Sequence, residues 1–119
     1  MSGLLYSITE QFVTWLKAND YAASTYPPKT GTEFVTVERT GGGVVDMVDR
    51  PAVAIQTWAK TEARAEEMAN EIRELLLLGA LPYGVHSVSV DSGPYPFYDE
   101  DTRLPRYQLA LNCAAYLTD

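Results

Sequence analysis

The sequence predicts an α+β domain of two layers, in which two helices pack on one face of a mixed four-stranded sheet. Two segments repeat apolar residues at helical spacing, and four others have the alternation or β-forming composition of strands. The chain has 119 residues, which is enough for one domain and too few for two. We therefore expect a single domain over residues 1–119, with the order helix, strand, strand, helix, strand, strand and with long loops.

The first helix is expected to begin after Ser7, because Glu10 follows it at the capping-box spacing. The helix should end near Asn19. Residues 21–32 then form a loop, since Tyr26-Pro27-Pro28 forbids a helix and favours an extended path. The apolar stripe of this helix consists of Leu5, Ile8, Phe12, Trp15 and Leu16.

The first two strands are predicted at residues 33–39 and 52–59, which are rich in β-forming residues. Thr40 and the glycines after it are expected to end the first strand, which makes residues 40–51 a loop. In the second strand, one face holds Val53, Ile55 and Thr57, and the other holds Ala54, Gln56 and Trp58.

The second helix is predicted from its N-cap Thr61 to a C-terminal stop at Gly79. Its outer side is largely acidic, as a solvated helix face requires. Its buried stripe consists of Ala65, Met68, Ala69, Ile72, Leu75 and Leu76.

The last two strands are predicted at residues 85–91 and 107–117, on either side of a proline- and glycine-rich loop over residues 92–106. The passage through residues 52–91 should be a right-handed crossover, which makes the sheet mixed. One face of the final strand holds Tyr107, Leu109, Leu111, Cys113 and Ala115.

The predicted loops at residues 19–32, 40–51 and 92–106 make up about a third of the chain. Each of them is far longer than the usual ~4–6 residues of a connection. Tyrosine is enriched where proteins contact one another. The loops therefore predict contact surfaces for other proteins. Four of the eight tyrosines lie in them: Tyr21, Tyr26, Tyr95 and Tyr98.

The formal net charge is −7, from 16 acidic and 9 basic residues. This balance argues against adhesion to nucleic acid or anionic lipid, which requires clustered Lys and Arg. The single cysteine excludes an internal disulfide. We expect neither a signal peptide nor a membrane helix, because the longest apolar run, at residues 75–81, falls short of the ~20 residues that a bilayer needs. The chain is expected to be made in the cytoplasm.

Two residues are candidates for catalysis, and neither predicts an enzyme. His86 is the only histidine, and a Ser/His/Asp set can be written with Asp91 and either Ser87 or Ser92. Neighbours on one strand seldom form such a set, so we expect His86 to be an exposed histidine on an edge strand. Cys113 lies in an apolar row without a basic neighbour, which indicates a buried side chain and not a nucleophile.

No pattern predicts a metal or a cofactor. Asp99, Glu100 and Asp101 resemble the start of a calcium loop, but the glycine and the distal glutamate of such a loop do not follow. Gly41-Gly42-Gly43 lacks the Lys-Ser/Thr pair of a phosphate-binding loop and indicates a flexible hairpin or arm.

Several short segments, taken in order, carry a family resemblance. They are residues 34–42 (FVTVERTGG), Asp49-Arg50-Pro51 leading into residues 53–59 (VAIQTWA), the helix with Ala63, Ala65, Ala69 and Leu75, then Gly93-Pro94-Tyr95 with Phe97 and Asp99, and residues 105–109 (PRYQL). Over roughly residues 33–116 the chain resembles the tail terminator, or tail completion, proteins of bacteriophages with long non-contractile tails. The specificity lies in the order of the segments and not in any one motif.

The resemblance implies a structural virion protein without an active site or cofactor. Such proteins form a hexameric ring on the last ring of the tail tube, stop further tube subunits from adding, and offer a surface to the head–tail connector protein. DNA passes through the ring without specific binding, and no membrane is involved. The implied partners are other copies of the chain, the tail tube protein and the connector protein.

Two groups of residues are hypothesised to carry this function. The acidic loop of Asp99, Glu100 and Asp101 would face the lumen or the connector. The interface with a neighbouring subunit or the tube would be formed by Arg39, Gly41, Gly42, Gly43, Val44, Val45, Arg50, Tyr95 and Tyr98.

Three alternatives stay open. A different connector or completion protein of the head–tail junction shares the size and the role. A small ferredoxin-like ligand-binding module has a similar order of elements. A hydrolase or transferase is the third, with His86 as its base.

Overall fold

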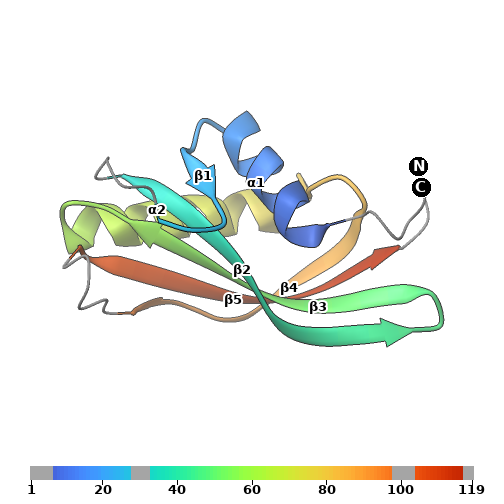
Figure 1. Ribbon diagram of the computed structural model, residues 1–119. Helices are drawn as coiled ribbons and strands as arrows, with labels where there is room; N and C mark the ends of the chain where they lie inside the picture. Colours follow the sequence, from blue (N-terminus) through green and yellow to red (C-terminus); the bar gives the residue numbers. More distant parts are fainter. Residues whose placement is uncertain (1–6, 28–32, 98–103, 117–119) are drawn as a thin grey trace.

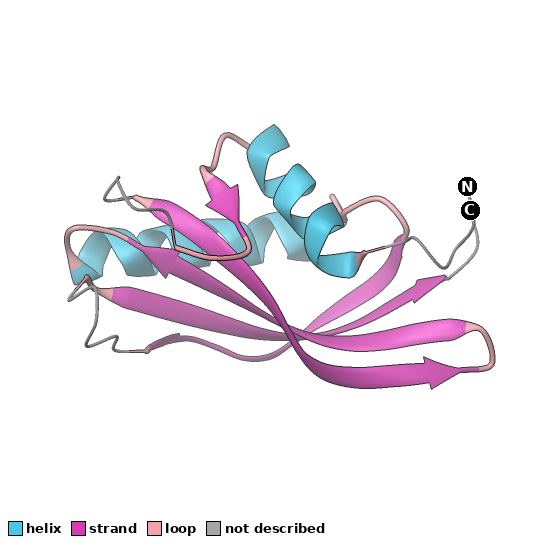
Figure 2. Cartoon of the chain, in the orientation of Figure 1, coloured by secondary structure: helices cyan, strands magenta, loops and turns pink. Residues whose placement is uncertain are grey.

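The computed structural model describes residues 7–27, 33–97 and 104–116. Over these residues the chain is an α+β domain, in which two helices lie on one side of a mixed five-stranded sheet (Figures 1 and 2). The elements are α1 (Ile8–Ala18), β1 (Ala23–Ser24), β2 (Phe34–Val45), β3 (Val48–Trp58), α2 (Glu62–Leu77), β4 (Val85–Pro96) and β5 (Arg106–Tyr116).

The strand order across the sheet is β1-β2-β3-β5-β4. β1 pairs with β2 in parallel, and the other neighbouring pairs are antiparallel. Helix α2 connects β3 to β4, which run in the same direction with β5 between them. The α+β class, the mixed sheet and the two helices are thus confirmed. The expected count of four strands is wrong, because β1 adds a fifth through its pairing of Ala23 with Val35 and Ser24 with Thr36. A two-residue strand is too short to show alternation in the sequence.

Both helices begin at the predicted caps. The Ser7 hydroxyl accepts a hydrogen bond from the Glu10 backbone N–H, and the Thr61 hydroxyl accepts one from the Arg64 backbone N–H. Each cap satisfies a backbone donor that the first helical turn leaves free. After α2 ends, Gly79 adopts a positive φ of 83°, where glycine carries no steric penalty.

The core lies between the two helices and the face of the sheet that they cover. Phe12 and Leu16 of α1 are fully buried, as is Ile72 of α2. Burying a side chain of this size stabilises the fold by about 1.5–3 kcal/mol, so this layer is the main source of stability. The strands contribute mainly Val35, Val37, Val53, Ile55, Leu109 and Leu111, of which the last four lie on the predicted faces. No helix in the described part of the chain is long and apolar enough to span a bilayer.

The loop predicted at residues 40–51 is wrong, because β2 and β3 continue through it as a hairpin with a turn at Asp46 and Met47. A register shift between Arg39 and Gly41 absorbs the irregular segment. Gly42 has φ +91°, and a Cβ there would lie 2.0 Å from the Arg50 carbonyl oxygen. The glycines therefore allow the strands to stay paired. The pairing of β3 with β5 skips Arg50 and Pro51, where proline has no N–H to donate.

The loop predicted at residues 92–106 is also partly wrong, since β4 extends to Pro96. β4 is an edge strand, where prolines such as Pro94 and Pro96 are tolerated because one side of the strand needs no hydrogen-bond donors. Gly93 has φ +102°, and a Cβ there would lie 2.5 Å from the Gln108 carbonyl oxygen. Glycine is therefore required for the close approach to β5.

Candidate functional site

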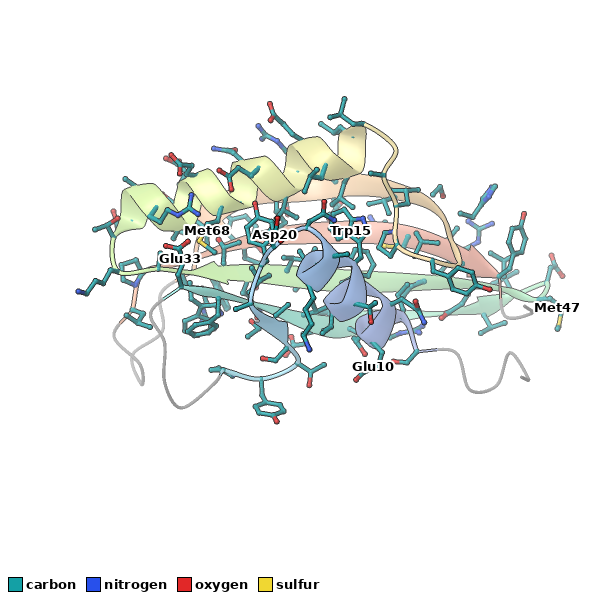
Figure 3. All side chains as sticks on the ribbon, turned by 90° about the horizontal axis from the view of Figure 1, so that it is seen from above. Glu10, Trp15, Asp20, Glu33, Met47 and Met68 are labelled. Carbon is teal, nitrogen blue, oxygen red and sulfur yellow. The ribbon has the colours of Figure 1, made fainter. Side chains whose placement is uncertain are left out.

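The β2–β3 hairpin extends beyond the helices that cover the rest of the sheet (Figure 1), and Met47 marks its end (Figure 3). Asp46 and Met47 adopt φ values of 51° and 66°, the left-handed conformation of a tight two-residue turn. Val44, Val45 and Met47 are 55%, 58% and 63% exposed. We call residues 44–47 the hairpin tip. Large apolar side chains gathered at an exposed end indicate a contact surface.

An ion pair fixes the base of this hairpin. The two terminal nitrogens of Arg39 donate to the two carboxylate oxygens of Asp49, both at 2.7 Å. The Asp49 side chain is 7% exposed and that of Arg39 is 33% exposed. Arg39 Nε also donates to the Gly41 carbonyl, which joins the pair to the irregular part of β2. Hydrogen bonding to Asp49 raises the pKa of Arg39. These bonds tie β2 to β3 beside the irregular part of β2.

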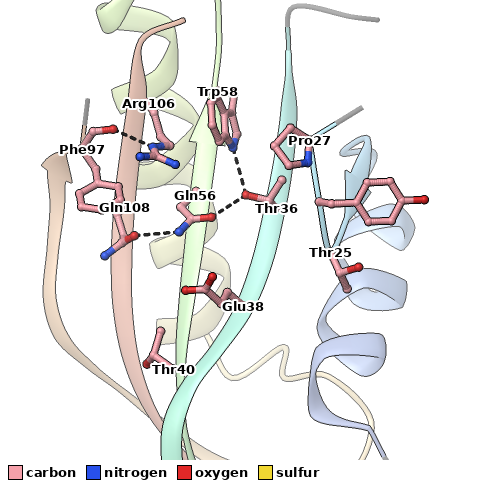
Figure 4. Close-up of a pocket in the computed structure, with 11 residues that line it drawn as sticks. Thr25, Pro27, Thr36, Glu38, Thr40, Gln56, Trp58, Phe97, Arg106 and Gln108 are labelled. Atoms are coloured by element: carbon pink, nitrogen blue, oxygen red, sulfur yellow. Dashed lines mark hydrogen bonds between the residues drawn. The ribbon is translucent and has the colours of Figure 1, made fainter. Parts of the chain in front are cut away.

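The open face of the sheet, opposite the helices, carries a row of hydrogen-bonded polar side chains. Trp58 Nε1 donates to Thr36 Oγ1 at 3.0 Å, and Thr36 donates to Gln56 Oε1 at 2.7 Å. Gln56 Nε2 donates to Gln108 Oε1 at 2.9 Å (Figure 4), and Gln108 Nε2 donates to Tyr95 Oη at 2.6 Å. The row crosses β2, β3, β5 and β4. No buried side-chain nitrogen or oxygen of the described residues lacks a hydrogen-bond partner.

Above this row lies a groove with a volume of about 550 Å³. Arg106 lies between two rings, 4.6 Å from the Trp58 centroid and 4.2 Å from the Phe97 centroid, and its Nε donates to the Phe97 carbonyl. Phe97 and Pro27 stand on opposite sides of the floor (Figure 4). We call this the open-face groove; its lining is Thr25, Tyr26, Pro27, Thr36, Glu38, Thr40, Gln56, Trp58, Phe97, Arg106 and Gln108.

The structure brings together most of the residues hypothesised to form an interface. Arg39, Arg50 and residues 41–45 all lie in the β2–β3 hairpin. Tyr95 lies apart from them in β4, half-buried beside Gln108. Tyr98 and the acidic residues Asp99, Glu100 and Asp101 lie outside the described residues.

Of the tyrosines expected in loops, only some lie where a partner can reach them. Tyr21 is half-buried, and its hydroxyl donates to Glu71 Oε1 at 2.6 Å, so this tyrosine joins α2 to the chain after α1. Burial raises the pKa of Tyr21, and the hydrogen bond to Glu71 raises it further. Tyr26, by contrast, is 70% exposed at the border of the open-face groove.

The two candidates for chemistry differ in exposure. His86 is on the edge strand β4, exposed, with its ring 5.2 Å from that of Tyr116. Cys113 is buried in β5, and desolvation raises the pKa of its thiol to about 12, which makes it a poor nucleophile. Among the residues that the structure describes, no three His, Cys, Asp or Glu side chains are grouped as a metal site requires.

The open-face groove is not among the sites predicted from the sequence, although the sequence contains a signal for it. The alternation of the second and fourth predicted strands already placed Gln56 with Trp58 on one face, and Gln108 on the corresponding face of its own strand. Two glutamines facing each other across neighbouring strands, as these do, indicate an open polar face. The missing information was the neighbour relation of β3 and β5, which no local pattern reveals.

Neither a protein-family model nor a curated protein sequence matches this chain. The likeness to tail terminator proteins therefore rests on the segments quoted from the sequence.

Proposed function

We propose that this chain is a structural virion protein that forms a ring at the head-proximal end of a bacteriophage tail tube. The ring, a hexamer in this proposal, ends tube polymerisation and provides the surface to which the head–tail connector binds. The protein would be made in the host cytoplasm and reside in the virion at the head–tail junction. It would act without a cofactor and without catalysis.

The single observation that carries the proposal is the hairpin tip. Val44, Val45 and Met47 are all more than half exposed, and Arg39 and Asp49 hold the hairpin that presents them. In a ring, one surface of each subunit binds a different surface of the next subunit, so every subunit must offer both surfaces. The hairpin tip supplies one such surface. The resemblance of residues 33–116 supplies the kind of ring.

The charge of the chain suits passage of DNA through the ring. A formal net charge of −7 per subunit repels phosphates at short range. This repulsion is screened beyond about 10 Å at physiological ionic strength. A lumen with this charge lets DNA pass without retaining it.

A different connector or completion protein of the head–tail junction is the nearest alternative, because the same ring surfaces would serve it. The ligand-binding module is favoured by one observation, the open-face groove. Its volume of about 550 Å³ falls within the range of small-molecule sites. Its floor is already hydrogen-bonded to itself, however, which leaves few polar groups free to recognise a small polar ligand.

The test is a tube-elongation assay with the tail tube protein encoded by the same genome. Adding the wild-type chain should stop tube growth, whereas the variant Val44→Asp/Met47→Asp should leave growth unchanged, because two carboxylates cannot be buried in an apolar contact. Both positions are exposed, so the fold should keep its stability within about 0.5 kcal/mol.

The matched control is Leu77→Asp/Leu78→Asp, which makes the same change of charge at two exposed leucines near the end of α2. This variant should stop growth as the wild type does. Unchanged tube growth with the wild-type chain would contradict the proposed function. If the wild type and the tip variant stop tube growth equally well, the hairpin tip is not part of the surface that ends polymerisation.

A further inference from the structure

The hairpin tip lies beyond the open-face groove along β2. Thr36 and Thr40, both in the lining of the groove, precede Asp46 by ten and six residues of extended strand, which corresponds to roughly 33 and 20 Å at the rise of a β-strand. The longest extent of the molecule is 42 Å. One chain therefore carries a projecting apolar end and, further back along the same strands, a hollow that its own tip does not reach.

The tip has the shape of an inserted element. Val44 and Val45 are neighbours on β2, so their side chains point to opposite faces of the hairpin. A hairpin that lies flat on a surface needs only one apolar face. A tip that is apolar on both faces buries both only when it enters a space between two walls.

The groove offers such a space. Its walls carry Tyr26 and Phe97, which are 70% and 41% exposed, and Pro27 stands opposite Phe97 (Figure 4). These are two of the large apolar side chains that the described part of the chain leaves exposed. The polar side chains of the floor are hydrogen-bonded to one another, so an apolar side chain that binds above them leaves none of them without a partner. A Met47 side chain between aromatic rings also gains sulfur–aromatic contact.

The charges agree with one orientation of the tip. Asp46 is the only charged residue of the tip, and Arg106 is the cation of the groove. Glu38 lies along the same groove and would repel Asp46. The tip therefore fits with Asp46 toward Arg106 and with its valines toward the walls.

We propose that the hairpin tip of one copy of this chain inserts into the open-face groove of the next copy. The inference rests on the proposed function, since it names the contact from which the ring would be built. The contact is heterologous, and repetition around a closed circle uses every tip and every groove.

The size of the contact explains why a ring and not a dimer is expected. A standard specific interface involves about 20–30 residues on each side. The tip has four, so one tip in one groove binds weakly. Closure of the circle makes the last contact intramolecular, with a high effective concentration. The free chain should therefore associate weakly in solution, and the contact should persist once subunits are arranged on a tube end.

Site-directed cross-linking tests the contact. Met47→Cys places a thiol at the tip, and Thr25→Cys places one at the exposed border of the groove. The native Cys113 is buried and its pKa is raised to about 12, so it contributes little background. The two variants are mixed at rising concentration, with and without tail tubes, and treated with a short bis-maleimide. The control partner is Glu74→Cys, an exposed position on α2.

Docking holds the two thiols at high effective concentration, so the 47–25 adduct should exceed the 47–74 adduct by roughly tenfold or more. The double variant Met47→Cys/Thr25→Cys should give a ladder of multimers. An excess of the 47–25 adduct supports the contact even if no ring forms on tubes, in which case only the proposed function fails. Rings without that excess overturn the contact and leave the proposed function standing. No excess and no rings overturn both.

Discussion

Replacement of Trp58 by alanine is expected to lower the free energy of unfolding by about 3–5 kcal/mol, the range for removing a buried aromatic side chain. Trp58 is 2% exposed at the end of β3. Its ring stacks on Phe34 with the centroids 5.2 Å apart, and the Arg106 guanidinium lies over it. The substitution removes both contacts and the hydrogen bond to Thr36. Small domains are stable by only about 5–15 kcal/mol, so this loss is a large part of the total.

The measurement is urea unfolding followed by circular dichroism. Trp58→Phe keeps a six-membered ring beside Phe34 and removes the rest of the indole together with its N–H, so it should cost less than Trp58→Ala, about 1–2 kcal/mol. Leu78→Ala, at an 82% exposed position, should change stability by less than about 0.5 kcal/mol. A Trp58→Ala variant as stable as Leu78→Ala would show that the open face does not hold Trp58 as described.

Replacement of Arg39 by alanine is expected to lower the free energy of unfolding by about 2–3 kcal/mol, between the ~1 kcal/mol of an exposed ion pair and the ~3–5 kcal/mol of a fully buried one. The reason is Asp49, whose side chain is 7% exposed and would be left buried without its hydrogen-bonding cation. Asp49→Ala should cost less, because the Arg39 side chain is already a third exposed and can turn toward water.

A double-mutant cycle measured by urea unfolding checks this pair. The variant Arg39→Ala/Asp49→Ala should lose less stability than the sum of the two single variants, since no unpaired charge stays buried. Additive losses, or a larger loss for Asp49→Ala than for Arg39→Ala, would mean that the pair does not act as the geometry indicates.

Much of the fold follows from local patterns. Ser7 and Thr61 begin the helices because their hydroxyls meet backbone donors three residues later, a relation that is visible in the sequence. The alternation of β3 and β5 correctly separates the helix-facing residues Ile55 and Leu109 from the open-face residues Gln56 and Gln108. Each of these predictions depends only on neighbours along one element.

The errors come from residues whose local meaning depends on a partner strand. Gly42 usually signals the end of a strand, but here it permits a close approach to Arg50 that keeps β2 and β3 paired. Pro94 and Pro96 usually exclude a strand, but β4 is an edge where they are tolerated. The sequence thus predicts a loop with a flexible hairpin or arm over residues 40–51, whereas β2 and β3 stay paired through it as a hairpin with an apolar end.

The candidate site was predicted only in part for the same reason. The sequence singled out the stretch from Arg39 to Arg50 and the valines within it. The groove is formed by residues from β2, β3, β5 and the segments next to β1 and β4, and only the strand order brings Trp58, Arg106 and Phe97 together.

The proposed function requires that this chain form a closed ring on the end of a tail tube. Electron microscopy of the purified chain mixed with tubes of its own tail tube protein tests it most directly, with the mass of the free chain measured alongside. We expect a single ring of six subunits on one end of each tube, while the free chain is monomeric or weakly associated. Tubes with bare ends, beside a chain that stays a compact monomer or dimer, would contradict it.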